Sequence, residues 1–324
     1  MLHGALVGAW HVHFEQYADE FSSHPDCHIT VLWDDDPVRG EQAAKKYNCD
    51  FEPDYDRLLT RPDVDAVIVA SQTNRHSELI QKAARAKKHI YTEKVLAFTY
   101  AEALEIARTV KDSGVCFCIS FPWACRPFFQ AARRLVEDGT LGDITYARFR
   151  NCHNGALAGW LPEAFYDPVL CGGGAMMDLG AHSMYLLDML LGLPDSICSA
   201  FTHVTGRAVE DNAVALLRYK NGAIASAETG FASEHNPFTL ELCGTKGTLL
   251  SGGYTDATVI NTGNGWEPVE LPAPLPCPMD QWVDGILTGS PIPFDIDCAV
   301  RLTQLMETAY RSYRSGRTEP LADI

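Results

Sequence analysis

Short apolar runs alternate with amphipathic stretches through the first third of the chain. The runs with the length of buried strands are 2–8, 28–34, 65–70, 89–92 and 115–120. Between them, apolar residues recur at helical spacing in 12–21, 37–47, 74–86 and 100–113. Strands that are apolar along their whole length and alternate with helices are typical of a parallel sheet covered on both faces. The pattern therefore predicts a doubly wound α/β domain over residues 1–121.

The pattern changes after residue 121. Helices are expected at 127–138 and 174–191, with a strand at 143–150 between them. Strands then follow one another at 196–205, 212–219, 223–230, 238–243 and 247–250, before helices return at 279–287 and 297–315. Asn221 and Gly222 form a hairpin signal between two of these strands. Residues 122–324 are therefore predicted to form an α+β domain with a large open-faced, mainly antiparallel sheet.

Composition narrows the range of partners. The formal net charge of −16 repels phosphate backbones and anionic bilayers, so neither nucleic acid nor membrane is expected as a partner. No apolar run is long enough to span a bilayer, and the first residues lack the basic segment of a secretory signal, so we expect a cytoplasmic protein. A large sheet with one uncovered face usually buries that face in a homo-oligomer, here a homodimer or homotetramer.

The 11 cysteines argue against a metal site or a disulfide framework. None stands in a C-x-x-C pair, and no grouping of Cys and His has the spacing of zinc ligands. In a cytoplasmic protein such scattered cysteines are expected to be free thiols. We therefore expect no metal.

The first strand–turn–helix has the position of a dinucleotide-binding loop. A strand that ends at Gly8 leads into a helix, whose N-terminus would receive a dinucleotide pyrophosphate. The complete fingerprint is G-x-G-x-x-G, whereas this chain has only the first glycine, followed by Trp10, His11, Val12 and His13. Taken alone, the turn leaves a strand–turn–helix without a ligand equally open.

Asp34 favours a cofactor at this turn. It ends the second predicted strand, where a carboxylate can accept hydrogen bonds from the adenosine ribose. Asp35 and Asp36 follow, and three acids would repel a 2′-phosphate, so we expect NAD rather than NADP. The alternative is a solvated acidic turn before Pro37.

Three polar residues form a candidate catalytic cluster. Glu93 and Lys94 follow a predicted strand at the carboxyl edge of the sheet, where an ammonium can stabilise a developing alkoxide. Asp178 and His182 are four residues apart in a glycine-rich helix and share a face with Tyr185 nearby. His182 can exchange a proton near neutral pH, as hydride transfer from an alcohol carbon requires. The alternatives are a surface lysine and a helix-stabilising pair.

The loop before the glycine-rich helix contains candidate substrate contacts. Trp160, Phe165, Tyr166 and Asp167 combine aromatic faces with an acid, which would suit a carbohydrate. Packing of a buried loop explains the aromatic residues equally well. The further candidates are His153, Asn154 and His235.

Together these residues resemble the Gfo/Idh/MocA family, named for glucose–fructose oxidoreductase, inositol dehydrogenase and a rhizopine-catabolism protein. The similarity runs nearly end to end. Its E-K-P motif looks like residues 93–95, its T-P-N-x-x-H like 71–76, and its G-G-G-x-x-x-D-x-G-x-H-x-x-D like 172–182 with the last acid at Asp188. Val95 and Gln72 replace two prolines, and Ala124 stands where a basic residue is often found.

The resemblance implies a Rossmann domain followed by an open-faced sheet domain that acts on sugars and inositols. It implies that Lys94 is catalytic, that His182 is the general acid/base and that Asp178 supports both. The residues expected at the cofactor are Gly8, Trp10, His11, Val12, Asp34, Ser71, Thr73, His76, Glu93 and Lys94. Those expected at the substrate are Lys94, Trp160, Tyr166, Asp178 and His182.

The expected function is an NAD(P)-dependent oxidoreductase that moves hydride between nicotinamide and a ring hydroxyl carbon of a sugar, inositol or glycoside, with the 3-position as one candidate. A non-catalytic NAD-binding sugar sensor and a redox-neutral enzyme with tightly bound NAD are the alternatives. We also hypothesise that His11 or His13 compensates for the missing glycines by hydrogen-bonding phosphate or substrate.

Overall fold

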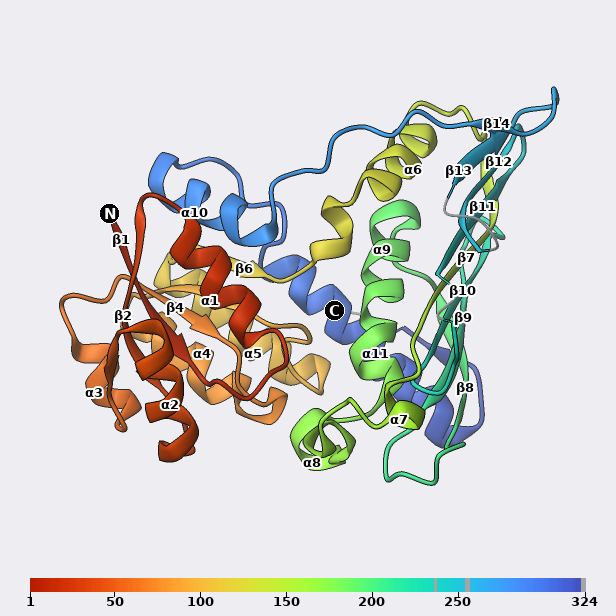
Figure 1. Cartoon of the computed structure of the whole chain (residues 1–324). Helices are drawn as coiled ribbons and strands as arrows, with labels where there is room; N and C mark the ends of the chain where they lie inside the picture. Colours follow the sequence, from red (N-terminus) through yellow and green to blue (C-terminus); the bar gives the residue numbers. More distant parts are fainter. Residues whose placement is uncertain (236–237, 254–256, 322–324) are drawn as a thin grey trace. The chain divides into compact units, whose positions relative to one another are not determined.

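The computed structural model describes residues 1–235, 238–253 and 257–321, which form two compact units (Figure 1). The first unit comprises Met1–Phe121 and Pro276–Thr303, and the second comprises Pro122–Leu275 and Gln304–Ile324. The junction after residue 121 coincides with the change in sequence pattern. Residues 276–303 belong to the first unit, whereas the sequence pattern predicts domains at 1–121 and 122–324.

The returning segment joins the first unit through apolar contacts. Its helix α10 (Pro278–Thr288) buries Trp282 completely. The Trp282 ring lies 5.6 Å from that of Tyr91 and 6.3 Å from that of Phe21, centroid to centroid. Burial of aromatic surface against the sheet and α1 is strongly favourable, which accounts for the discontinuous unit.

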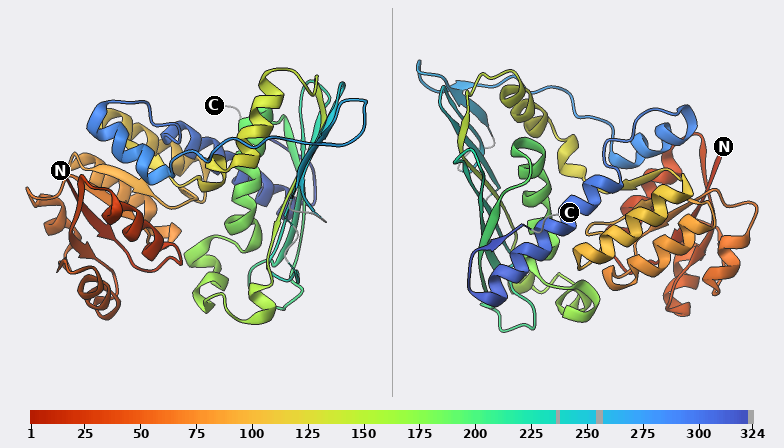
Figure 2. Two further views of the ribbon diagram at one scale, coloured as in Figure 1. Left: turned by 45° about the horizontal axis from the view of Figure 1, so that its top comes forward. Right: turned by 180° about the vertical axis from the view of Figure 1, so that it is seen from behind.

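The first unit contains a six-stranded parallel sheet, as the alternating pattern predicts. Its strand order is β3 (Asp50–Phe51), β2 (Cys27–Trp33), β1 (Leu2–Val7), β4 (Ala66–Val69), β5 (His89–Thr92) and β6 (Phe117–Ile119). Helices cover both faces, with α1 beside α10 and α4 beside α5 (Figure 2). The order reverses between β1 and β4, which makes their carboxyl ends the expected ligand-binding edge.

Local signals set the ends of most helices in this unit. Besides α10, its α-helices before residue 121 are α1 (Phe14–Ser23), α2 (Pro37–Tyr47), α3 (Tyr55–Thr60), α4 (His76–Arg85) and α5 (Tyr100–Ser113). Asp36 caps α2 by accepting the amides of Val38 and Arg39. By contrast, α1 begins two residues later than predicted, because the His11 amide donates to the Ala70 carbonyl and ties the turn to β4.

The second unit contains a nine-stranded sheet. Its order is β14 (Glu267–Pro268), β13 (Thr258–Asn261), β12 (Thr248–Gly252), β11 (Thr239–Gly244), β7 (Ile144–Cys152), β10 (Ile224–Gly230), β9 (Asn212–Arg218), β8 (Ser196–Thr202) and β15 (Glu319–Pro320). Within this second sheet, β7–β10 is the only parallel pair among the described strands. The predicted hairpin joins β9 to β10, with Gly222 at φ +91°.

One face of this sheet carries the helices of the unit. The helices α6 (Pro127–Glu137) and α9 (Ala181–Leu191) pack on that face, and no described helix of this unit lies on the other (Figure 1). The expected open-faced sheet is therefore confirmed. Short helices α7 (Gly155–Ala158) and α8 (Pro168–Cys171) lie in the loop before the glycines, and α11 (Ile296–Ser315) leads from the first unit into the second.

Three further observations bear on the remaining expectations. Among the described residues, no helix combines the length and apolarity needed to cross a bilayer. All 11 cysteines are free thiols. The described part of the chain holds no group of three or more His, Cys, Asp or Glu side chains that could bind a metal ion.

Candidate active site

The carboxyl end of β5 carries a buried ion pair. Lys94 Nζ lies 3.6 Å from Glu93 Oε1, and the two side chains are 2% and 1% exposed. Tyr17 Oη donates to Glu93 Oε2 and lies 2.9 Å from Ser120 Oγ. A buried ammonium needs such a carboxylate to offset its desolvation. The Lys94–Val95 peptide bond is cis.

The turn after β1 needs its one glycine. Gly8 has φ +85°, and a Cβ there would lie 2.8 Å from the Cα of Ser71. The Gly8 amide donates to the Trp33 carbonyl at 2.8 Å, and the Ala9 amide donates to Asp34 Oδ2 at 2.6 Å. Bare backbone therefore lies at the switch point, between the ends of β2 and β4.

Aromatic residues occupy the rest of the fingerprint. His11 Nδ1 accepts the His13 amide at 3.2 Å and lies 3.8 Å from Glu93 Oε2. The rings of His11 and His13 are 5.2 Å apart, and that of Trp10 lies 6.0 Å from that of His11. The turn is thus connected to the Glu93–Lys94 pair through His11. Val12 is exposed.

His76 links two loops at the carboxyl edge of the first sheet. It is completely buried, with Nδ1 2.9 Å from the Val95 carbonyl and Nε2 3.3 Å from that of Ser71. Burial lowers the pKa of His76 to about 4, so the ring is neutral near pH 7. It joins the loop after β4, where Thr73 begins a short 3₁₀ turn, to the segment that follows Lys94.

The three glycines of the second unit allow close packing around a buried carboxylate. A Cβ on Gly173 would overlap Tyr310, and one on Gly174 would overlap the Glu210 carbonyl. Glu210 Oε1 accepts the amides of Gly174 at 2.9 Å and Met176 at 3.0 Å, and the hydroxyl of Tyr310 at 2.6 Å. Burial raises the pKa of Glu210.

Glu210 was not identified from the sequence, because a lone acid near the sheet strands carries no local signal. Its contacts place it at the start of the segment that carries Asp178 and His182. The sequence predicts one helix over residues 174–191, but the structure divides this segment into two parts. A π-helical turn (Met176–Gly180) contains Asp178, and α9 follows with His182 in its first turn.

A tyrosine hydroxyl holds His182. The Nδ1 atom of His182 lies 2.9 Å from Tyr185 Oη, which accepts the Trp123 amide at 3.2 Å. The Trp123 and His182 rings lie 5.4 Å apart. Because a hydroxyl both donates and accepts, either neutral tautomer of His182 satisfies this contact.

A cation also lies beside these rings. The Arg126 guanidinium lies 4.2 Å from the centre of the Trp123 ring, and burial lowers its pKa. In the sequence, Arg126 directly precedes Pro127. The basic residue expected from the family resemblance would stand at position 124, which is Ala124 in this chain. No sequence motif marks Trp123, apart from its place in the same segment.

Trp160 and His153 form a partly open aromatic surface. Trp160 is 55% exposed, its ring lies 4.6 Å from that of His153, and its Nε1 donates to Asn154 Oδ1 at 3.2 Å. The His153 ring stacks on Phe231 at 4.9 Å. Burial lowers the pKa of His153 while the Asp178 carboxylate acts in the opposite direction, which puts Asp178 in its vicinity.

Tyr166 and Asp167 of the same loop have packing and capping contacts, and His235 lies in a different loop, between β10 and β11. Tyr166 is buried with the Arg207 guanidinium 3.6 Å from its ring centre. Asp167 caps α8 by accepting the amides of Val169 and Leu170. His235 is exposed with φ +56°. None of these contacts connects the three residues to Asp178.

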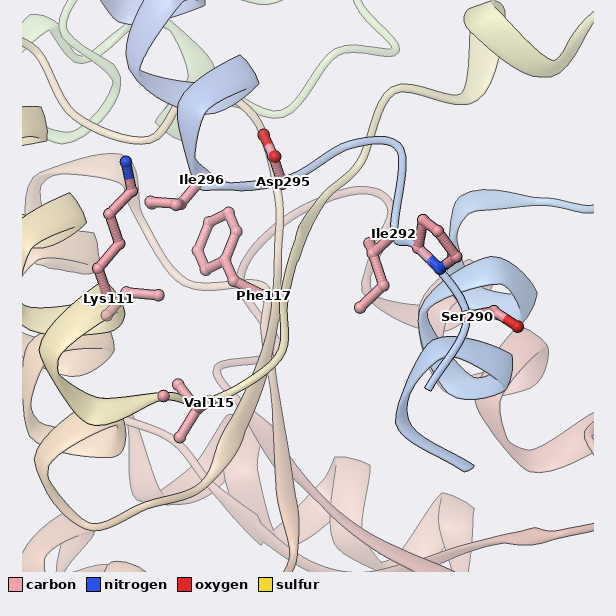
Figure 3. A pocket seen from close by; sticks show the side chains of 10 residues that line it. Lys111, Val115, Phe117, Ser290, Ile292, Asp295 and Ile296 are labelled. Carbon is pink, nitrogen blue, oxygen red and sulfur yellow. The ribbon is translucent and has the colours of Figure 1, made fainter. Parts of the chain in front are cut away.

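A pocket of about 560 Å³ lies elsewhere in the first unit (Figure 3). Its walls are mainly apolar and include Val115, Phe117, Ile292 and Ile296. It lies between the end of α5 and the segment before α11, and it contains no residue predicted for the active site.

Two family models match the chain. The model described as the oxidoreductase family with an NAD-binding Rossmann fold matches residues 2–121. The model described as the GFO/IDH/MocA C-terminal domain matches residues 129–250. The second match ends before the segment that returns to the first unit.

Individual proteins with similar sequences carry different activities in their names. The chain is 28% identical over 223 residues to 2,7-anhydro-N-acetylneuraminate hydratase of Mediterraneibacter gnavus, covering 66% of this chain and 58% of that protein. It is 27% identical over 218 residues to myo-inositol 2-dehydrogenase of Thermotoga maritima, covering 64% and 63%. The alignments thus span less than two thirds of either relative.

Solved structures show the same fold over the whole chain. Levoglucosan dehydrogenase in complex with NADH and levoglucosan has a TM-score of 0.88 at 19% identity, covering 99% of this chain and 100% of that one.

Proposed function

The chain belongs to the GFO/IDH/MocA oxidoreductase family, with an NAD-binding Rossmann domain at residues 2–121, and we propose that it transfers hydride between NAD and a ring hydroxyl carbon of a sugar, inositol or glycoside. The observation that carries the proposal is the setting of His182, whose Nδ1 is held by the Tyr185 hydroxyl. A histidine held in this way is suited to exchange the hydroxyl proton. The 3-position is one candidate for the oxidised carbon.

The first unit fits the cofactor. The positive φ of Gly8 and its close approach to Ser71 leave bare backbone at the switch point. Gly8, Trp10 and His11 would line the pyrophosphate, and Glu93 and Lys94 the nicotinamide end. NAD, when bound, supplies the hydride acceptor.

In the proposed reaction, His182 would exchange the proton of the substrate hydroxyl, and Lys94 and Asp178 would bind the oxygens of the substrate. When His182 donates Nδ1–H to Tyr185, its Nε2 can take the proton of a substrate hydroxyl. When Tyr185 donates instead, Nε2 carries the proton needed for the reverse direction. The Lys94 ammonium would stabilise alkoxide charge, and Asp178 would accept hydrogen bonds from neighbouring hydroxyls.

The second unit supports a carbohydrate as substrate. The half-exposed Trp160 ring offers a face for stacking on a sugar ring, and His153 and Asp178 offer polar groups near it. The names of relatives point the same way, since they include dehydrogenases of inositol and levoglucosan.

A redox-neutral enzyme with tightly bound NAD is the second candidate. The relative named as a hydratase of an anhydro sugar favours it, because hydration changes no net oxidation state. A non-catalytic sugar sensor would not need Lys94, Asp178 and His182 together.

Purified protein mixed with NAD and a panel of cyclic sugars, inositols and glycosides tests the proposal. We expect the absorbance of reduced nicotinamide to rise with at least one compound, and His182→Ala and Lys94→Ala to abolish the rise. Product formation without net reduction, from protein that retains NAD through purification, would establish the redox-neutral alternative. NAD binding with neither product nor reduction would establish the sensor.

A further inference from the structure

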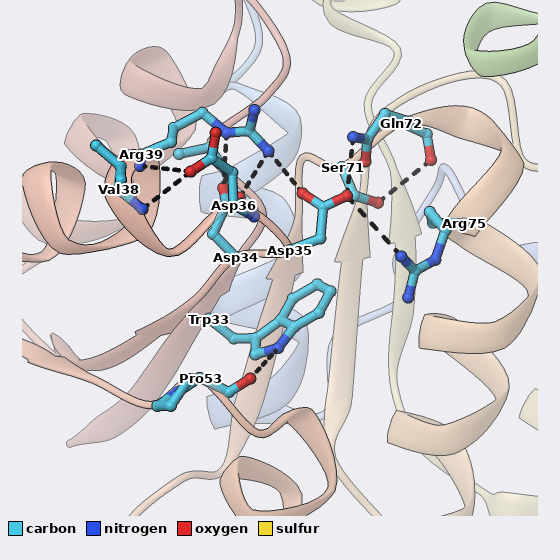
Figure 4. A network of polar contacts seen from close by, with 11 residues as sticks. Trp33, Asp34, Asp35, Asp36, Val38, Arg39, Pro53, Ser71, Gln72 and Arg75 are labelled. Atoms are coloured by element: carbon cyan, nitrogen blue, oxygen red, sulfur yellow. Dashed lines mark hydrogen bonds and ion pairs between the residues drawn. The ribbon is translucent and has the colours of Figure 1, made fainter.

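We propose that Asp35, and not the preceding Asp34, selects NAD over NADP, by neutralising two arginines already present at the adenosine end of the cofactor site. The inference rests on the cofactor of the proposed function but not on its substrate. It refines the expectation that three consecutive acids act together, because the structure gives each acid a different role (Figure 4).

Asp34 is a structural tie. Its side chain is fully buried, and its two oxygens accept four N–H groups. Oδ1 accepts the Asp36 amide at 2.8 Å and Arg39 Nη2 at 2.6 Å. Oδ2 accepts the Ala9 amide at 2.6 Å and Arg39 Nε at 3.0 Å. A carboxylate has about four acceptor directions, so a ribose hydroxyl would have to displace one of these donors.

Asp36 has a local role as well. Its Oδ1 accepts the amides of Val38 and Arg39 at 2.9 and 3.2 Å, which caps α2. Its contacts are therefore directed into its own helix. Asp35 is the acid of this turn whose side chain contacts Gln72 and Arg75 in the loop after β4.

Asp35 collects donors from two separate segments. Its side chain is 31% exposed, and Oδ1 accepts Arg39 Nη2 at 2.6 Å. Oδ2 accepts Gln72 Nε2 at 3.1 Å and lies 3.9 Å from Arg75 Nη1. In Figure 4, Asp35 lies between Arg39 on one side and Gln72 and Arg75 on the other. It thus joins α2 to the loop after β4.

The two arginines are suited to an anion once Asp35 is gone. The side chains of Arg39 and Arg75 are 31% and 33% exposed. Asp34 holds the Arg39 fork, and the Arg75 guanidinium lies 5.8 Å from the Trp33 ring centre. Guanidinium groups bind phosphate through paired, charge-assisted hydrogen bonds. With Asp35 present, their charge is compensated and a 2′-phosphate meets a carboxylate, whereas ribose hydroxyls meet an acceptor.

Direct binding of NAD and NADP to the full chain, by isothermal titration calorimetry after removal of bound nucleotide, tests this assignment. We expect Asp35→Ser to raise the affinity for NADP relative to NAD by at least about tenfold, equivalent to one charge-assisted hydrogen bond. Asp36→Ser removes the same charge one residue away and keeps a capping hydroxyl, so it is the matched control. It should leave the ratio of affinities within about twofold.

The arginines supply the second arm. Adding Arg75→Ser to Asp35→Ser should remove most of the gain in NADP affinity. Asp35→Asn, which keeps the side-chain shape, should shift the ratio in the same direction and covers the case in which the serine variant fails to fold. An unchanged ratio in a folded Asp35 variant, or an equal shift in Asp36→Ser, would overturn the proposal. Failure of the sugar panel would leave these binding results intact, so the two proposals fail separately.

Discussion

Tyr310 donates a hydrogen bond to Oε1 of the buried Glu210 at 2.6 Å, and the same oxygen accepts two amides at the start of the segment that carries Asp178 and His182. One carboxylate oxygen therefore secures the helix start against α11. The glycines at 173 and 174 are needed because any side chain there would occupy the space of these two partners.

Glu210→Ala should lower the free energy of unfolding by about 3 kcal/mol, since it leaves two buried amides and a hydroxyl without their acceptor. Urea denaturation followed by circular dichroism measures the loss. Glu210→Gln keeps an acceptor oxygen and should lose distinctly less. Equal losses in the two variants would contradict the capping role.

Tyr185→Phe should lower kcat by on the order of 10- to 100-fold with little change in KM, because it removes the hydroxyl that holds His182 Nδ1. The pH profile of kcat/KM should shift as well, which a purely structural defect would not cause. Tyr313→Phe, at a half-exposed ring of the second unit, is the control. A loss confined to KM would count against the positioning role.

His76 should make the first unit less stable in acid. Its folded pKa of about 4 lies below the ordinary value of 6.5, so the unfolded chain binds the proton more readily. The contribution of neutral His76 to the free energy of unfolding is therefore fully present above about pH 6.5. It is lost as the pH drops toward 4, by about 3 kcal/mol at most. His76→Gln should flatten this part of the curve of unfolding free energy against pH. Parallel curves for the two proteins would refute the assignment.

His11→Ala should weaken NAD binding by about tenfold, because the ring links the turn after β1 to Glu93. His13→Ala should have a smaller effect, since its backbone amide makes the contact with His11. Titration calorimetry with NAD provides the comparison. Unchanged affinity and turnover in both variants would remove any role for these rings at the cofactor.

The open face of the second sheet should form the contact between copies of the chain. Leu216 is 44% exposed on β9, with Val214 and Ile224 also exposed nearby. Leu216→Arg should shift the protein from dimer or tetramer toward monomer in light scattering coupled to size-exclusion chromatography. Val204→Arg, in a loop, should not. If the unmodified protein is a monomer, the prediction that this face joins copies of the chain is wrong.

The sequence predicts best where the cause of a structure is local. The helix α2 is predicted at its exact bounds because the Asp36 cap, Pro37 and a left-handed Asn48 act within a few residues. The two-residue strands β3, β14 and β15 have no pattern of their own and were not predicted. The π-helical turn at Asp178 is likewise not marked by helical periodicity, and Gly180 in it leaves no room for a side chain beside Met176.

The residues of the candidate site also fall into those that a local motif marks and those that only tertiary contacts identify. Lys94, Asp178 and His182 are predicted because motifs mark them. Glu210 and Trp123, which contact the segment that carries Asp178 and His182, lie far from it in the sequence and have no such motif. Asp34 was expected to face the ribose, and the contact that occupies it, with the Ala9 amide, joins two different strand ends. Sequence patterns identify which residues are buried or polar, and the partner of each is decided by tertiary structure.

The discontinuity of the first unit has a consequence for synthesis. The rings of Phe21 and Tyr91 contact Trp282, which leaves the ribosome after nearly the whole of the second unit. A nascent chain that ends at residue 121 therefore exposes apolar surface that α10 covers in the folded protein, and the Rossmann domain can complete its core only after residues 122–275 have been made. A fragment cut at residue 121 should aggregate, whereas one joined to residues 276–303 by a linker has all the parts of a stable domain.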